Sequence, residues 1–231
     1  MKVLELFAGS RSFAKIAAER GHAIFTSDWE QYGSIDYVTD IMNFDVTKLP
    51  WTPDVIWASP PCTTFSVASI GKYWELKDGH YLPRREGAVI GQNIVEQTLH
   101  IIKLLKPDYY FIENPRGMLR KLIGDIAERA EFDGPPIRHT VTYCQYGETR
   151  QKPTDIWTNC KAWKPRPACK PRSSCHEAAP RGAKTGTQGM KGAYLRSQVP
   201  PQLCNEIITT VERAFNTFLL DDEERRSVGR S

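Results

Sequence analysis

The sequence predicts an α/β fold with a Rossmann-like, mostly parallel sheet and helices on both of its faces. Short apolar runs of strand length, as in residues 2–7, 55–58 and 109–112, alternate along the chain with longer segments of helical period. Two of these runs lead directly to prolines, Pro60 and Pro115, which cannot extend a strand ladder. Such alternation is typical of parallel strands joined by crossover helices.

The length of 231 residues fits one substantial domain with a small appendage, and a chain of this size needs no disulfide or metal merely to fold. It contains neither a run of about 18 apolar residues nor a signal peptide. We therefore expect a soluble, intracellular protein with no membrane partner. Its six cysteines are expected to be free, catalytic or metal-bound rather than paired.

The net charge of +4 is unevenly distributed. Residues 138–196 hold twelve Lys or Arg and three Asp or Glu, a net +9, so the rest of the chain carries −5. A segment this basic suits a polyanion such as nucleic acid. The alternative is a solvated basic loop without a partner, because charge runs are commonly just surface.

The first unit of the chain is predicted to be a strand, a loop and a helix. Residues 2–7 form the strand, the small residues 8–10 form a tight turn, and Ser10 or Ser12 caps a helix that ends at Gly21. The helix has an apolar face at every third or fourth position. Its free backbone amides are placed to bind the charged end of a nucleotide-like ligand.

The second and third strands carry acids at their ends. Residues 23–26 form a strand that ends at Asp28 and Trp29, where the acid can accept hydrogen bonds from a ribose and the indole can stack on a purine. Residues 36–40 form a short third strand. Asp40 at its end either holds an adenine amine or simply caps the next turn.

A thiol follows the next strand. The apolar run 55–58 stops at Pro60 and Pro61, which hold Cys62 on a stiff turn at the carboxyl end of the strand. Ligands bind at that edge of an open parallel sheet, so Cys62 is a candidate nucleophile. The alternative is a small buried side chain, as most lone cysteines are.

Residues 63–85 show no clear period and are predicted to be a long loop. Loops of this length in compact domains are usually functional lids or disordered. Basic residues alternate here with aromatic ones, which suits contact with a nucleic-acid backbone and unstacked bases. These residues are Lys72, Tyr73, Trp74, Lys77, His80, Tyr81, Arg84 and Arg85.

A carboxylate is predicted to reach the same sheet edge as the thiol. Residues 87–105 form a helix, and the strand 109–112 that follows delivers Glu113 to its carboxyl end. Glu113 and Cys62 should therefore converge. The alternative is a structural ion pair between Glu113 and Arg116.

The second half of the chain begins with a helix over residues 118–130. Strands are predicted over 139–146 and 155–158, and a last amphipathic helix over 200–218. Residues 221–231 are charged and almost free of apolar side chains, so they are expected to be a frayed tail.

In this order, the strand-loop-helix start, the Pro-Pro-Cys run and the Glu-Asn-Pro run resemble the cytosine-5 DNA methyltransferase family over roughly residues 1–158 and 194–218. Two strand-end motifs in the right order are far more specific than either alone. The resemblance implies an S-adenosylmethionine-dependent catalytic domain of residues 1–158 and 194–220. It also implies a small basic recognition segment, 159–193, and leaves 221–231 as a flexible tail.

The resemblance assigns S-adenosylmethionine to three strand ends and a closing segment. Residues 6–9 look like the family's first cofactor motif, Asp28 and Trp29 like its ribose and adenine contacts, and 199–201 like the start of its closing motif. The residues implied to bind the cofactor are Phe7, Ala8, Gly9, Ser10, Asp28, Trp29, Asp40, Ile41, Ser59, Pro60 and Ser197.

The sequence departs from the family at three places. Residues 10–12 replace the usual glycines, and Ser197 stands where an Asn is usual. Residues 150–154 replace the family's Gln-x-Arg-x-Arg motif. Of the two bases there, we expect Arg150 to reach the carbonyl oxygen of the target base, with Lys152 as the second candidate.

The implied reaction is methyl transfer to carbon 5 of a cytosine flipped out of double-stranded DNA. Cys62 would add to carbon 6 of the ring, and Glu113 would hold the ring while its charge changes. The other residues implied to contact the substrate are Ser66, Asn114, Pro115 and Lys152. The resemblance also implies a monomer in the cytoplasm of a bacterial or phage-infected host cell, with a restriction endonuclease as a candidate partner.

Three other functions remain open from the sequence. A DNA-binding regulator with the same fold but no turnover would be compatible with the altered residues 150–154. The same chemistry could act on RNA. A thiol-dependent enzyme on small nucleotides would explain a short recognition segment, although a lone nucleotide needs few cationic contacts.

The recognition segment holds a candidate zinc site. Three thiols and one imidazole match the ligand set of a structural zinc ion, which could order a segment too polar to form its own core. The candidate ligands are Cys160, Cys169, Cys175 and His176. Free thiols in a basic loop are the alternative.

Overall fold

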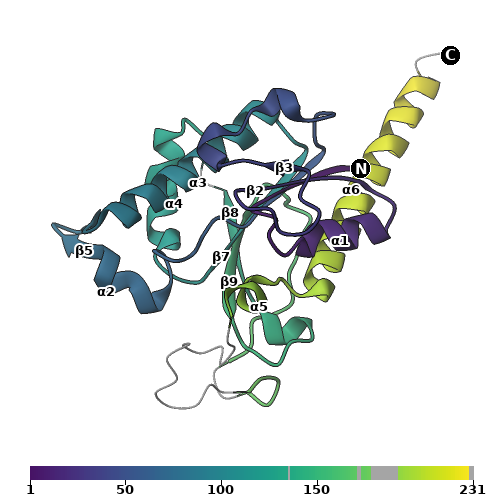
Figure 1. Ribbon diagram of the computed structural model, residues 1–231. Coiled ribbons are helices and arrows are strands. Elements are labelled where there is room, and N and C mark those ends of the chain that lie inside the picture. Colours follow the sequence, from purple (N-terminus) through teal and green to yellow (C-terminus); the bar gives the residue numbers. More distant parts are fainter. Residues whose placement is uncertain (135, 171–172, 178–191, 229–231) are drawn as a thin grey trace.

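A computed structural model describes residues 1–134, 136–170, 173–177 and 192–228, with 193 and 218–228 as backbone only (Figure 1). Within these residues the chain forms a seven-stranded sheet of order β3-β2-β1-β4-β7-β9-β8. The strands are β1 (Lys2–Leu6), β2 (Ala23–Asp28), β3 (Tyr37–Val38), β4 (Val55–Ala58), β7 (Tyr109–Pro115), β8 (Ile137–Thr142) and β9 (Pro153–Thr158). The first five strands in this order, β3, β2, β1, β4 and β7, pair in parallel. Strand β9 runs antiparallel between β7 and β8. The predicted mostly parallel sheet is confirmed.

Helices cover both faces of the sheet, as predicted. The helices are α1 (Ser12–Glu19), α2 (Ile70–Tyr73), α3 (Glu86–Leu105), α4 (Leu119–Arg129), α5 (Ala193–Ser197) and α6 (Pro201–Val228), and the short 3-10 turns are η1 (Ile41–Asn43), η2 (Val46–Lys48), η3 (Val67–Ser69) and η4 (Tyr143–Tyr146). Figure 1 shows α3 and α4 on one side of the strands and α1 and α6 on the other. Among the described helices, none combines the length and the apolar character needed to cross a bilayer.

The core lies on both faces because successive side chains of a strand point to opposite sides. In β4, Ile56 and Ala58 pack in one apolar cluster with residues of α3 and α4. Val55 and Trp57 pack in a second cluster with residues of α1 and α6. A short all-apolar strand such as β4 is therefore explained by burial on two sides, and its end is fixed in space.

The segment predicted as a loop without secondary structure, residues 63–85, contains a β-hairpin. Strands β5 (Trp74–Lys77) and β6 (His80–Pro83) pair antiparallel around Asp78 and Gly79, whose φ angles are 52° and 82°. An Asp-Gly pair is the preferred two-residue turn for such a hairpin, since both positions need positive φ. The prediction of an unstructured loop is wrong because this turn signal was overlooked. Trp74 is buried and its indole donates to the carbonyl of Thr64 at 2.7 Å, which fixes the base of the hairpin.

Two other predicted boundaries differ from the structure. The predicted strand 139–146 ends at Thr142, and the 3-10 turn η4 follows and ends at Gly147, whose φ is 87°. The last helix, α6, continues past residue 218 to Val228, into the predicted tail. Residues 219–228 contain no Gly or Pro and four Glu or Arg, which favour helix, whereas Gly229 follows directly after its last residue.

Candidate active site

The two strand-end motifs meet at one edge of the sheet. Strands β4 and β7 are parallel neighbours with Ala58 opposite Ile112, so the residues after each strand end lie side by side. The Asn114 amide nitrogen donates to the carbonyl oxygen of Pro60 at 2.9 Å. Asn114 is fully buried, and its Oδ1 has no partner among the described residues. The Asn114 amide nitrogen thus holds the turn at Pro60, and the Asn114 Oδ1 remains available to a ligand.

The turn that carries Cys62 is locked against the start of α4. The Cys62 carbonyl accepts from the amides of Phe65 and Ser66 at 3.1 and 3.0 Å. Ser66 then forms a bridge with Gly117, and Met118 donates to the Phe65 carbonyl at 2.7 Å. A Cβ on Gly117 would lie 2.1 Å from that same carbonyl oxygen, so only glycine permits the approach.

Glu113 is buried beside two donors. Its Oε1 accepts from the Tyr143 hydroxyl at 2.9 Å and lies 3.7 Å from the Lys152 ammonium. Arg116, the partner in the structural alternative, is exposed. Tyr143 belongs to η4, and the sequence pattern did not reveal its contact with Glu113. Its place at the end of a predicted strand was the one signal that it could reach the edge of the sheet.

Lys152 and Arg150 have different surroundings. Lys152 is 4% exposed, lies over the Tyr143 ring at 4.5 Å, and donates to the Arg196 carbonyl at 3.1 Å. Its φ of 28° is uncommon for a side-chain-bearing residue and is typical of functional sites.

Arg150 is equally buried but is turned toward the closing segment. It forms an ion pair with Glu148 and donates to the carbonyls of Leu195, Arg196 and Gln198 at 3.3, 3.2 and 2.9 Å. The structure therefore gives Arg150 a clamping role, and it is Lys152 that lies next to Glu113.

Electrostatics show that the thiol, the carboxylate and the ammonium are neighbours. Burial raises the pKa of Cys62, as does the charge of Glu113, whereas Lys152 and Arg196 lower it. Burial lowers the pKa of Lys152, and Glu113 opposes that effect. The pKa values of Cys62 and Lys152 are thus both shifted by burial and by neighbouring charges, which is common at catalytic sites.

The loop after β1 is built around a buried acid that the sequence analysis missed. The Glu5 carboxylate accepts from the amides of Phe13 and Ala14, at 3.4 and 2.7 Å, and so caps α1. The predicted cap by Ser10 or Ser12 is wrong, because their hydroxyls bond each other at 2.7 Å. Burial raises the pKa of Glu5 to about 7, and the two amides oppose this. The amides of Phe13 and Ala14 are thus occupied, which removes them from the predicted ligand cradle.

The loop itself turns sharply toward β2. Phe7 and Arg11 have positive φ angles of 59° and 53°, and the Ala8 amide donates to the Ser27 carbonyl at 3.0 Å. A Cβ on Gly9 would lie 3.5 Å from the Asp28 carboxylate. The first loop and the end of β2 are therefore in contact, as a shared cofactor site requires.

The acid at the end of β2 is buried and its neighbour is not. Asp28 is 8% exposed, and burial raises its pKa while the amides of Glu30 and Gly9 lower it. Trp29 beside it is 73% exposed, so its ring is available for stacking.

The remaining predicted cofactor residues have local roles. Asp40 accepts from the Met42 amide at 2.9 Å and caps η1, as in the simpler alternative, and Ile41 is buried in the core. The Ser59 hydroxyl accepts from the Trp57 indole at 2.9 Å, next to Pro60. The exposed Ser197 donates to the Tyr194 carbonyl at 2.7 Å.

The closing segment returns to the first loop. The Val199 amide donates to the Ser12 hydroxyl at 3.1 Å, and α6 then packs beside α1. This is where the sequence resemblance placed it.

Comparison with known proteins agrees with this geometry. The family model for the C-5 cytosine-specific DNA methylase matches residues 1–130, more than half of the chain. The chain belongs to this family. The enzyme class predicted from the sequence, DNA (cytosine-5)-methyltransferase, is confirmed at the level of the family, and membership implies DNA as substrate and S-adenosylmethionine as methyl donor.

Two relatives of this methylase illustrate its size. A protein named "Probable DNA (cytosine-5)-methyltransferase" from Frog virus 3 (isolate Goorha) is 29% identical over 227 residues, which are 90% of this chain and 99% of that protein. The crystal structure of a proposed DNA modification methyltransferase encoded within an E. coli prophage is 16% identical and has a TM-score of 0.51. It covers 68% of this chain, which spans only 46% of that longer protein, and the likeness shows the fold alone.

The cofactor cradle of this methylase fits S-adenosylmethionine. The buried Asp28 carboxylate at a strand end suits a ribose, and the exposed Trp29 suits an adenine ring. A Cβ on Gly9 would lie 3.2 Å from the Tyr32 ring, which is a tight contact, so Gly9 keeps the loop close to the end of β2.

The predicted metal cluster of this methylase has one wrong member. Cys160 is fully buried in the apolar cluster with Trp163 and Phe111, so its thiol cannot reach the other predicted ligands. The atoms that come together belong to Cys144, Cys169, Cys175 and His176, and all lie within 4.8 Å of one another. Cys144 was overlooked because η4 precedes the recognition segment in the chain.

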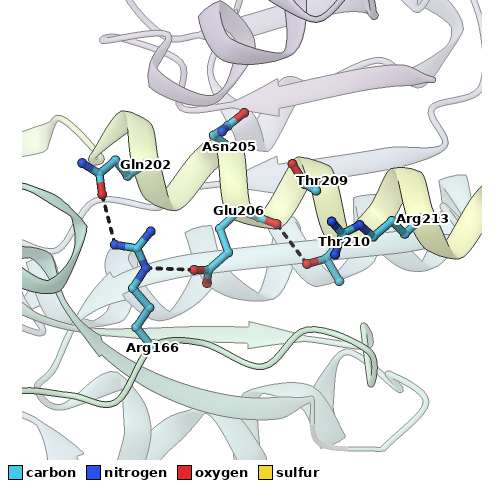
Figure 2. Close-up of a pocket in the computed structure, with 7 residues that line it drawn as sticks. All are labelled: Arg166, Gln202, Asn205, Glu206, Thr209, Thr210 and Arg213. Carbon is cyan, nitrogen blue, oxygen red and sulfur yellow. Dashed lines mark hydrogen bonds and ion pairs between the residues drawn. The ribbon is translucent and has the colours of Figure 1, made fainter.

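A polar pocket of about 350 Å³ runs along α6, away from the strand-end motifs (Figure 2). Its lining residues are Arg166, Gln202, Asn205, Glu206, Thr209, Thr210 and Arg213. Arg166 donates to Glu206 at 3.2 Å and to Gln202 at 3.0 Å, so these side chains satisfy one another. The pocket therefore marks the point where the segment after β9 is fastened to α6.

Proposed function

We propose that this methylase transfers a methyl group to carbon 5 of a cytosine extruded from duplex DNA, through a covalent bond between Cys62 and the ring. The observation that carries the proposal is the convergence of Cys62, Glu113 and Lys152 at one edge of the sheet. A nucleophile, an acid and a cation around a common space are what activation of a pyrimidine requires.

Cys62 supplies the nucleophile. Carbon 5 of cytosine is too weakly nucleophilic to take a methyl group until a thiolate has added to carbon 6. Burial and the charge of Glu113 raise the pKa of Cys62, whereas the charges of Lys152 and Arg196 lower it. The two cations therefore favour the thiolate that attacks the ring.

Glu113 holds the ring. Both described contacts of its carboxyl group, from Tyr143 and Lys152, go to Oε1. We assign Oε2 to the ring nitrogen 3 and the exocyclic amine, where a protonated carboxyl group offsets the negative charge that thiolate addition drives into the ring. Asn114 next to it bonds the Pro60 carbonyl at 2.9 Å and so ties the end of β7 to the turn before Cys62.

Lys152, rather than Arg150, is assigned to the carbonyl oxygen of the base. Its ammonium lies 3.7 Å from the Glu113 carboxylate, whereas the guanidinium of Arg150 is engaged by three carbonyls and Glu148. S-adenosylmethionine, held by Gly9, Asp28 and Trp29, would supply the methyl group and leave as S-adenosylhomocysteine. A solvent water then takes the carbon 5 proton as the bond between the Cys62 sulfur and carbon 6 breaks, which restores the enzyme.

The β5-β6 hairpin is proposed as the lid over the extruded base. It is separated from the Cys62 turn by η3 and α2 and is anchored by the buried Trp74. Lys77 and His80 are its exposed basic residues, and Lys72, Arg84 and Arg85 are exposed on either side of it. Flipping costs a few kcal/mol of stacking, and contacts from such a lid offset that cost.

The decisive experiment measures transfer of labelled methyl groups to mixed-sequence duplex DNA. We expect the wild-type protein to transfer and Cys62→Ser to lose transfer while it still binds DNA. A duplex containing 5-fluorocytosine, which cannot release its carbon 5 substituent, should form a denaturation-resistant complex with the wild type alone. Turnover by Cys62→Ser would refute the covalent role.

The same assay separates the other candidate functions. A DNA-binding regulator would bind duplex without transfer, and an RNA enzyme would place the label in ribonuclease-sensitive product. The matching family model is that of a DNA methylase, which favours DNA over RNA as the substrate. A monomeric state, a cytoplasmic location and a restriction counterpart remain predictions from the sequence.

A further inference from the structure

Four metal-binding side chains converge next to the proposed base pocket. The Cys144 sulfur lies 3.1 Å from that of Cys169 and 3.6 Å from that of Cys175. The His176 Nδ1 lies 3.6 Å from both Cys169 and Cys175. No pair among the four ligand atoms exceeds 4.8 Å.

The distance between Cys144 and Cys175 and both distances to His176 are close to those of a tetrahedral zinc site, whereas the Cys144–Cys169 distance is shorter. Zinc bonds at about 2.3 Å to sulfur and about 2.1 Å to nitrogen place the ligand atoms about 3.8 Å and about 3.6 Å apart. Three sulfurs and one imidazole nitrogen are a common closed ligand set for structural zinc. None of the four is used by the proposed reaction.

The surrounding polar groups support bound thiolates. The Gln151 amide nitrogen donates to the Cys169 sulfur at 3.2 Å, and that of Gln145 donates to the Cys175 sulfur at 3.4 Å. Donors of this kind orient metal ligands and offset their charge.

The backbone around the four ligands is also fixed. The Cys169 amide donates to the Thr142 hydroxyl at 2.9 Å, and the Glu177 amide donates to the Thr149 carbonyl at 2.7 Å. Both ends of the segment that holds three of the ligands are thus tied to the chain around η4.

The cluster joins the recognition segment to the wall of the base pocket. Cys144 directly follows Tyr143, which bonds Glu113, and Gln151 lies between Arg150 and Lys152. The Tyr143 amide also donates to the Gln151 carbonyl at 2.8 Å. A metal bound here would therefore fix the segment around residues 169–177 against the residues that face the base.

We propose that Cys144, Cys169, Cys175 and His176 bind one structural Zn²⁺ that fastens the recognition segment to η4. The site ties together parts of the chain that share little apolar contact, which is the usual role of structural zinc in polar segments. Its part in placing the recognition segment rests on the proposed function; the binding of zinc does not.

The first test is the zinc content of the purified protein, measured by mass spectrometry after gel filtration. We expect one zinc per wild-type chain, and near-complete loss in Cys144→Ala and Cys175→Ala. Cys160→Ala is the matched control, since Cys160 lies outside the cluster, and it should keep its zinc. An unchanged zinc content in both ligand variants, or none in the wild type, would overturn the proposal, and so would a disulfide between Cys144 and Cys169.

The second test identifies the ligands without relying on folding of the variants. Wild-type protein loaded with Co²⁺ should show thiolate-to-cobalt charge-transfer bands and the intense visible bands of a tetrahedral ion. In the exposed-ligand variant Cys175→Ser these bands should weaken, and His176→Asn should shift them. Gln151→Ala keeps all four ligands and should lower zinc affinity about 10-fold in chelator competition. A six-coordinate cobalt spectrum in the wild type would overturn the assignment, whatever the methyl-transfer assay shows.

Discussion

Glu5 shows how a single buried carboxyl group can serve as structural scaffold and still titrate in the physiological range. It is 3% exposed, yet it replaces the side-chain cap that Ser10 or Ser12 would give to α1. Sequence patterns favour Ser at a helix start, and only the spatial approach of β1 to the helix reveals the acid. The residue thereby couples the cofactor loop to pH.

Stability should fall as pH rises past the ordinary pKa of Glu5. The folded pKa is about 7 against an ordinary 4.5, so folding favours the protonated acid; its contribution is full below pH 4.5 and is lost as pH approaches 7. The shift corresponds to about 3 kcal/mol at most. Glu5→Gln stays neutral, so the difference in unfolding free energy between wild type and variant should decline over this window. Urea unfolding at several pH values measures it, and a constant difference would contradict the assignment.

Lys152 and Arg150 lie two positions apart in the sequence, but we expect substitution of Lys152 to affect mainly kcat and substitution of Arg150 to affect mainly stability. Lys152→Gln removes the cation next to Glu113, and we expect kcat to fall about 100-fold, as for loss of one donor to a developing charge. Arg150→Gln removes bonds to three carbonyls, so we expect mainly a lower unfolding free energy, by about 2–4 kcal/mol. Steady-state kinetics and urea unfolding on both variants separate the roles. The opposite pattern would restore Arg150 as the base contact.

At the scale of elements, the strands of the parallel sheet were the most predictable part. β4 and β7 are short apolar runs closed by proline, and their shared edge follows from parallel pairing. The hairpin at Trp74–Lys77 and His80–Pro83 was missed although Asp78-Gly79 signals it. Cys160 was misassigned because chain proximity does not reveal which thiols face the core. Tyr143 and Cys144 were missed because η4 interrupts an otherwise regular strand.

The contact between the Cys62 turn and the start of α4 predicts that replacing Gly117 with Ala lowers methyl transfer, whereas replacing Gly124 with Ala does not. Gly117→Ala would push the new Cβ against the Phe65 carbonyl, 2.1 Å away, and displace the nucleophile turn. We expect methyl transfer to fall at least about 10-fold, since small misplacements of reacting groups are costly. Gly124→Ala, in the middle of α4 with no atom within 4 Å of its new Cβ, should instead stabilise by about 0.5–1 kcal/mol and leave transfer unchanged. Equal activity of both variants would show that the turn is not held by Gly117.

At the scale of the whole molecule, charge is unevenly divided along the chain. The +9 of residues 138–196 stands against −5 elsewhere, and part of it is neutralised inside the fold, as where Arg166 pairs with Glu206. Lys161, Lys164 and Lys170 are exposed on the part of the segment that the structure describes. These lysines are therefore the ones whose contribution to DNA affinity can be tested without disturbing the core.

DNA affinity should depend steeply on salt, and these lysines should set the slope. Each phosphate contact contributes about 0.9 to the slope of log K against log salt concentration. Replacing Lys161, Lys164 and Lys170 with Gln should therefore lower the slope by up to about 2.7. Lys121→Gln, an exposed lysine on α4 outside the segment, is the matched control and should leave the slope unchanged. Fluorescence anisotropy over a salt series gives the slopes. A wild-type affinity that does not vary with salt would mean that the basic segment does not face DNA and that the duplex is bound by another surface.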